Sequence, residues 1–187
     1  MKALIVAALA LAPTSAVACA CCAEKGERYE FQSALADYEI EELARLVAKG
    51  RAQTFVTACD IDCVGGVENP QYDYDIALNI TDTSVELQLP EADASLSLSY
   101  GGTYTRYSVD TAPFSEGSSP DLFTELRFDG PLIATGDFAA ANDLSAQFIL
   151  TGTTNSCWSA EHFTHWSLDV ESDAVNFRLF GQLGQAD

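Results

Sequence analysis

The sequence predicts a mainly β protein, either an antiparallel β-sandwich or an up-and-down barrel, with one N-terminal α-helix. Two observations lead to this prediction. From residue 72 onward, apolar and polar residues alternate in a series of short segments, which is typical of antiparallel strands with one buried face. Turn-forming residues separate these segments, and the helical periods that a parallel βαβ sheet requires do not recur between them. The periodicity leaves sandwich and barrel open as alternatives.

A secretory signal precedes this domain at residues 1–18. Lys2 supplies the positive charge, residues 3–12 supply the apolar stretch, and Ala16-Val17-Ala18 has the small-x-small form that signal peptidase accepts. The apolar stretch is shorter than the roughly 20 residues that a membrane-spanning helix needs, so we expect no transmembrane span. Cleavage after Ala18 predicts an exported protein, either periplasmic or extracellular.

The chain is strongly acidic, with 28 Asp and Glu residues, 9 Lys and Arg residues and a formal net charge of −19. Lys2 is the charged residue of the signal, so its removal makes the balance more negative still. A surface of this charge repels nucleic acid, which excludes nucleic-acid binding as an expected function. The simplest interpretation is the solvated surface of an exported protein.

One helix is predicted near residues 37–49, after a cysteine-rich N-terminal segment at residues 19–32. Acidic residues follow Asp37 in the first turn, where the helix dipole favours them, and Gly50 stands where a helix stop is expected. The apolar residues that recur at helical spacing are Ile40, Leu43, Ala44 and Val47. Residues 33–187 are expected to form a single domain.

The strand predictions depend on apolar residues with a period of two. Gly101-Gly102 and Asp129-Gly130 are predicted as hairpin turns between strands, and Ser172-Asp173 as a weaker turn. Residues 53–59, 103–109 and 131–138 are weaker strand candidates. The residues predicted to face the core are Tyr72, Tyr74, Ile76, Leu78 and Ile80, then Val85, Leu87 and Leu89, then Leu96, Leu98 and Tyr100, then Leu122, Leu126 and Phe128, then Leu144, Ala146, Phe148 and Leu150, then Trp166, Leu168 and Val170, and finally Val175, Phe177 and Leu179.

All six cysteines are disulfide candidates, because export implies an oxidising compartment. Cys21 and Cys22 are adjacent, and a ring between neighbours is strained. Cys59 and Cys63 would lie roughly 13 Å apart in a straight strand, too far for a disulfide. We therefore expect the N-terminal cysteines to pair with distant partners and to tether the N-terminus to the domain. The candidates are Cys19, Cys21, Cys22, Cys59, Cys63 and Cys157.

A soft-metal site is the alternative use of these thiols, since thiolate and imidazole bind copper and zinc. The Cys-x-Cys-Cys spacing differs from the separated pairs of zinc sites. The two histidines also lack the spacing of the zinc-protease motif. A lipid anchor on Cys19 is a further alternative, although Ala16 stands where a lipobox prefers leucine. The metal ligands would be Cys19, Cys21, Cys22, Cys157, His162 and His165.

Three stretches, CACCAEKGERYE, RFDGPLIATGDF and NSCWSAEHFTHWSLDV, together resemble a group of small exported bacterial proteins with an N-terminal Cys-x-Cys-Cys segment. The resemblance implies no activity, substrate or cofactor. It implies only that the N-terminal cysteines and the CWSAEHFTHW segment are features of the same group of proteins. No Gly-x-Ser-x-Gly elbow marks a nucleophile. We therefore expect a non-enzymatic binding or structural domain of the cell envelope, whose partner is an unknown small molecule or envelope protein.

Overall fold

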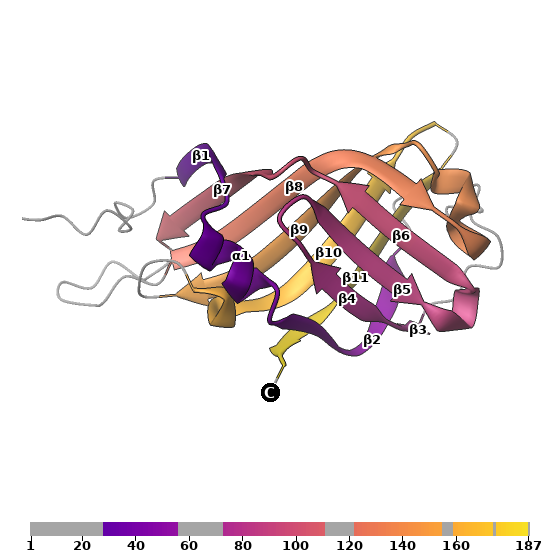
Figure 1. Cartoon of the computed structure of the whole chain (residues 1–187), viewed down its shortest axis with the longest axis horizontal. Coiled ribbons are helices and arrows are strands. Elements are labelled where there is room, and N and C mark those ends of the chain that lie inside the picture. The colour runs from indigo at the N-terminus through magenta and orange to yellow at the C-terminus, as the bar shows by residue number, and fades with distance from the viewer. Residues whose placement is uncertain (1–27, 56–72, 111–121, 155–158, 174, 187) are drawn as a thin grey trace, which may run out of the picture.

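The computed structural model describes residues 28–55, 73–110, 122–154, 159–173 and 175–186. Within these residues eleven strands form one antiparallel sheet, in the order β3-β2-β11-β10-β9-β8-β6-β5-β4, with β7 also beside β8 and β1 beside β7 (Figure 1). The mainly β prediction is confirmed.

The elements follow the chain in this order: β1 (Arg28–Ala34), α1 (Asp37–Leu43), β2 (Leu46–Phe55), β3 (Asp73–Asp75), β4 (Ala77–Ile80), β5 (Ser84–Leu89), η1 (Pro90–Ala92), β6 (Ala94–Ser99), β7 (Thr103–Asp110), β8 (Leu122–Ala134), η2 (Gly136–Ala141), β9 (Ser145–Thr154), η3 (Ala160–His162), β10 (Phe163–Glu171) and β11 (Asn176–Gln185), where η denotes a 3-10 helix.

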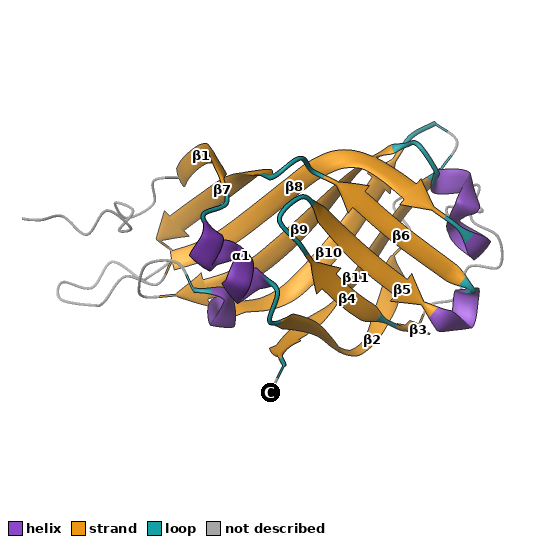
Figure 2. Cartoon of the chain, in the orientation of Figure 1, coloured by secondary structure: helices purple, strands orange, loops and turns teal. Residues whose placement is uncertain are grey.

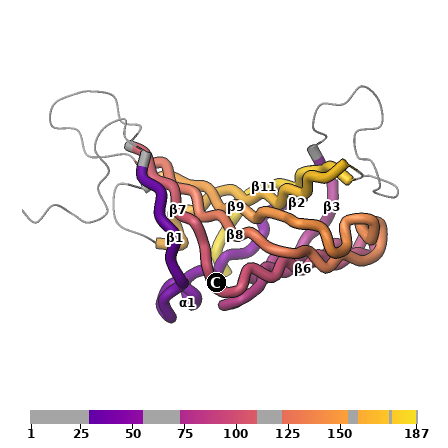
Figure 3. Tube along the Cα trace, turned by 90° about the horizontal axis from the view of Figure 1, so that it is seen from above, coloured from indigo at the N-terminus to yellow at the C-terminus, as the bar shows by residue number. Residues whose placement is uncertain are grey.

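The sheet curls so that the two strands at the ends of the strand order, β3 and β4, come together. These two strands are also consecutive in the chain. β3 pairs with β2, β4 pairs with β5, and Ile76 alone separates them. β6 and β7 likewise lie end to end along β8, with β6 against Leu132–Ala134 and β7 against Leu122–Arg127. Around the nearly closed sheet, strands therefore neighbour one another in chain order, which is the connectivity of an up-and-down barrel (Figures 1 and 3).

The helix is shorter than the sequence predicts. α1 ends at Leu43, and the predicted continuation to residue 49 is wrong because β2 begins at Leu46 and pairs with β11. Gly50 does not stop the helix. It lies within β2 with φ of 72°, beside a shift in the pairing of β2 with β11, where a β-bulge favours glycine. Residues 28–32, assigned above to the cysteine-rich segment, belong to β1.

Two of the predicted hairpin turns are also wrong. Gly101 and Gly102 have φ of 67° and 78° and form a kink between β6 and β7, which run in the same direction along β8. Asp129-Gly130 lies inside β8, which continues to Ala134. The turn at Ser172-Asp173 is confirmed, because it joins the paired strands β10 and β11.

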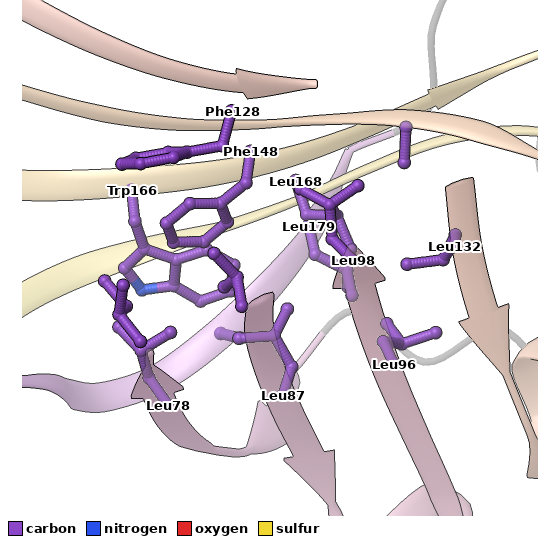
Figure 4. Packing of buried hydrophobic residues seen from close by; sticks show 14 of the residues in the cluster. Leu78, Leu87, Leu96, Leu98, Phe128, Leu132, Phe148, Trp166, Leu168 and Leu179 are labelled. Atoms are coloured by element: carbon purple, nitrogen blue, oxygen red, sulfur yellow. The ribbon is translucent and has the colours of Figure 1, made fainter. Parts of the chain in front are cut away.

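The predicted apolar faces meet inside the barrel (Figure 4). Phe128 packs edge-on against Tyr100, with ring centroids 4.7 Å apart, and lies 6.2 Å from Phe148. Phe148 in turn stacks on Trp166 at 5.9 Å. The residues predicted to face the core are buried, except that Ile76 and Leu144 are partly buried and Tyr72 lies outside the described residues. Leaving out β1, which lies beside β7, and counting β3 with β4 and β6 with β7 as single strands, the barrel has eight strands among the described residues. An eight-stranded barrel has an interior of the width that side chains fill.

Short helices lie at the two ends of the barrel (Figure 2). α1 and η3 contact each other at one end, and η1 and η2 contact each other at the opposite end. The end that carries α1 and η3 is called the α1 end below. There η3 folds closely over β9, since a Cβ added to Gly152 would lie 1.9 Å from the carbonyl oxygen of His162. The glycine therefore permits η3 to cover this end.

Candidate functional site

A group of buried polar side chains lies at the α1 end of an otherwise apolar interior. Successive residues of a strand face opposite sides, so the alternate residues of β7 point to the same side. Ser108 of β7 lies in register with Thr124 of β8, so two hydroxyl side chains face each other on this side of the sheet. We call this group the arginine cluster, and its members are Glu39 of α1, Tyr104, Arg106 and Ser108 of β7, and Thr124 of β8.

Arg106 is the centre of the cluster and is only 8% exposed. Its Nε donates a hydrogen bond of 3.3 Å to Ser108 Oγ, which lies 3.4 Å from Thr124 Oγ1. The guanidinium carbon lies 5.8 Å from the ring centroid of Phe31 on β1. Burial lowers the pKa of Arg106, but an arginine remains cationic at physiological pH. A positive charge is therefore held inside the barrel.

The buried carboxylate of the cluster is already engaged by other donors. Glu39 Oε2 accepts a 2.9 Å hydrogen bond from the backbone N–H of Ala36, and Oε1 accepts one of 3.3 Å from the Tyr104 hydroxyl. Burial, followed by the charge of Glu39, raises the pKa of Tyr104 to about 12, so the phenol stays a neutral donor. Glu39 favours the charged form of Arg106 through space, without an ion-pair contact between them.

The other arginines whose side chains the structure describes each pair with a carboxylate, whereas Arg106 has no such partner among the described residues. Arg127, for example, lies 2.6 Å from Glu125 and stacks on Tyr107, with its guanidinium carbon 4.1 Å from the ring centroid. Within the described residues no carboxylate lies within 4.0 Å of the Arg106 guanidinium. The arginines that do pair with a carboxylate are Arg45, Arg51, Arg127 and Arg178.

Exposed aromatic side chains border the arginine cluster. Tyr29 and Phe31 are 38% and 45% exposed, and on β1 they lie in register with Ser108 and Arg106 of β7. Tyr38 of α1 is 60% exposed and is close enough to Arg106 to affect its pKa. β1, α1 and β7 lie side by side in both views (Figures 1 and 3). Apolar surface next to a few convergent polar groups is typical of a small-molecule site.

Sequence reasoning missed this site, although one signal was present. In residues 103–109 the inward positions hold Tyr104, Arg106 and Ser108, and an arginine on the buried parity of a strand is uncommon. The aromatic border was missed because residues 28–32 were not predicted as a strand.

The two histidines predicted as metal ligands, His162 and His165, lie in different environments. His162 ends η3; its Nδ1 is buried without a hydrogen-bond partner among the described residues, and its Nε2 lies 3.7 Å from Glu161 Oε1. His165 is exposed on β10, with Nδ1 2.9 Å from Thr164 Oγ1. In the part of the chain that the structure describes, no three His, Cys, Asp or Glu side chains form a metal-binding group.

The cysteine predictions concern positions that the structure does not describe. Both the disulfide hypothesis and the copper or zinc alternative therefore stay predictions. The cysteines outside the described residues are Cys19, Cys21, Cys22, Cys59, Cys63 and Cys157.

Among the described residues, no helix has both the length and the apolar character that a membrane crossing requires.

Comparisons with known proteins add no further assignment. No family model, curated protein or solved structure matches this chain.

Proposed function

We propose that the protein is an exported, non-enzymatic binding module of the cell envelope, which holds a small molecule at the α1 end of its barrel. The observation that carries this proposal is the buried Arg106, a cation without a described ion-pair partner in a chain with a large excess of acids. Burying a charge costs several kcal/mol when it is not paired. A ligand group that pairs with Arg106 would offset that cost.

The cluster supports binding better than nucleophilic catalysis. A serine or threonine nucleophile needs a general base within hydrogen-bond reach. Ser108 Oγ is instead bonded to Arg106 and lies next to Thr124 Oγ1, and neither of these neighbours is a base. Glu39, the carboxylate of the cluster, is bonded to Ala36 and Tyr104.

A fragment screen on the oxidised mature protein tests this proposal. Anionic, cationic and neutral fragments are added singly, and binding is mapped from amide NMR shifts. We expect at least one fragment to shift resonances of β1, α1 and β7 saturably, and Phe31→Ala to weaken that binding at least tenfold. Ile133→Ala is the matched control, because Ile133 is a 56% exposed apolar residue on β8 outside the cluster. If no fragment of any charge binds at this end, the proposal is wrong.

A further inference from the structure

We infer that the ligand of this site carries an oxyanion with a single negative charge, such as a carboxylate, bound by the Arg106 guanidinium, on a small apolar body that lies against Phe31 and Tyr29. The inference rests on the proposed binding function and names the ligand class of that same site.

One side of the Arg106 guanidinium has no described hydrogen-bond partner. Arg106 donates its Nε–H to Ser108, and within the described residues no hydrogen bond is formed by its two Nη groups. Arginine presents its donors as a planar fork that matches the two oxygens of a carboxylate or phosphate. A buried fork with open donors is therefore complementary to an oxyanion.

Two hydroxyls lie beside this fork. Ser108 and Thr124 lie 3.4 Å apart, Oγ to Oγ1, and either can be the donor. A hydroxyl hydrogen rotates to suit its partner, so both groups can turn toward an anion without movement of the backbone. Hydrogen bonds to a charged acceptor are about twice as strong as those between neutral groups.

The carboxylate of Glu39 limits the charge that a ligand can carry. Glu39 interacts with Arg106 through space and is held in place by Ala36 and Tyr104. Its negative charge disfavours a second negative charge nearby. The site therefore favours a ligand with a single negative charge over a dianion.

Exposed aromatic rings of β1 would contact the body of the ligand. Phe31 stacks beside the guanidinium, and 45% of its surface remains exposed. Tyr29 follows on the same face of β1, in register with Ser108. An aromatic or short acyl group attached to the oxyanion would cover these rings while the oxyanion reaches Arg106.

Titration calorimetry with three matched probes tests the inference on the oxidised mature protein. The probes are phenylacetate, phenyl phosphate and the neutral phenylacetamide. We expect phenylacetate to bind at least tenfold more tightly than phenylacetamide, which corresponds to about 1.4 kcal/mol. Arg106→Gln should abolish that difference. Arg178→Gln is the control, because Arg178 pairs with Asp169 on the outer face, and it should leave the difference unchanged.

Each outcome bears on a defined part of the inference. We expect phenyl phosphate, which carries close to two negative charges at pH 7, to bind more weakly than phenylacetate. Tighter binding of phenyl phosphate would overturn the preference for a single negative charge. If phenylacetamide binds as tightly as both anions, or if neither anion binds, the inference is wrong, and this comparison needs no variant. If Arg106→Gln fails to fold, Arg106→Lys is used instead. Because lysine keeps the charge but lacks the fork, it should reduce the preference for phenylacetate without abolishing it. Fragments that bind at the α1 end regardless of charge would leave the proposed function intact and remove only the oxyanion.

Discussion

Gly130→Ala is expected to destabilise the barrel strongly, because Gly130 lies where β8 changes its neighbour from β7 to β6. A Cβ added at this position would lie 1.9 Å from the carbonyl oxygen of Ser99, 2.8 Å from its carbonyl carbon and 3.4 Å from Tyr100 Cα. Ordinary contact begins near 3.4 Å. All three neighbours are backbone atoms, so no side-chain rotation relieves the clash.

The size of the expected destabilisation depends on how far the backbones of β6 and β8 must move apart. The two backbones have to separate locally by about 1.5 Å, and overpacking on this scale costs about 1–3 kcal/mol or more. The adjacent pairing of Leu98 with Leu132 is expected to weaken with it, at about 1 kcal/mol for each hydrogen bond lost. We therefore expect a loss of about 3–5 kcal/mol in the free energy of unfolding. For a chain of this size, the corresponding fall in Tm is about 6–20 °C.

Urea and thermal unfolding, followed by circular dichroism, measure this loss. Gly184→Ala is the matched control, since Gly184 also lies in a strand, and the nearest atom to its added Cβ is 3.9 Å away. We expect Gly184→Ala to change stability by less than about 0.5 kcal/mol. If Gly130→Ala is as stable as Gly184→Ala, the close approach of β6 and β8 at this point is wrong.

Three further predictions concern pH, the core and the cysteines. The pKa of Tyr104 is raised to about 12, so the neutral phenol stabilises the fold fully below pH 10, and this stabilisation is lost as the pH rises toward 12. The urea midpoint should therefore fall between pH 9 and pH 11.5, and it should fall less in Tyr104→Phe. An equal fall in both proteins would contradict the burial of the phenol. Leu168→Ala, at a 1% exposed core position, should cost about 2–5 kcal/mol, whereas equal urea midpoints for this variant and Ile133→Ala would count against the barrel interior. Reduction of the protein purified from its native host should add the mass of six hydrogens if its six cysteines form three disulfides. An acyl chain or a bound metal in the intact mass would instead support the alternatives.

The strands were the most predictable part of the fold. Residues such as Val85, Leu87 and Leu89 alternate with polar neighbours, and all three are buried in β5. The period of two reports which face of a strand is buried, and this property is local. The position of the helix start was also predictable, because α1 begins at Asp37.

The errors occurred where pairing partners decided the local structure. Residues 46–49 continue the helical spacing, but they form the start of β2 because they pair with β11, more than 130 residues away in sequence. Asp129-Gly130 has the composition of a hairpin turn, yet it stays extended because both β6 and β7 line up against β8. Propensity is a weak prior that such tertiary pairing overrides.

The sequence by itself determined that this chain carries a secretory signal pattern, a strongly acidic balance and apolar faces for an antiparallel sheet. These properties depend on composition and short-range periodicity. Only the tertiary structure decided that the sheet curls into a nearly closed barrel, and that Arg106, Glu39 and Phe31 meet at one end of it. Those residues come from β7, α1 and β1, so their proximity depends on strand register and on the packing of α1, which no local pattern encodes.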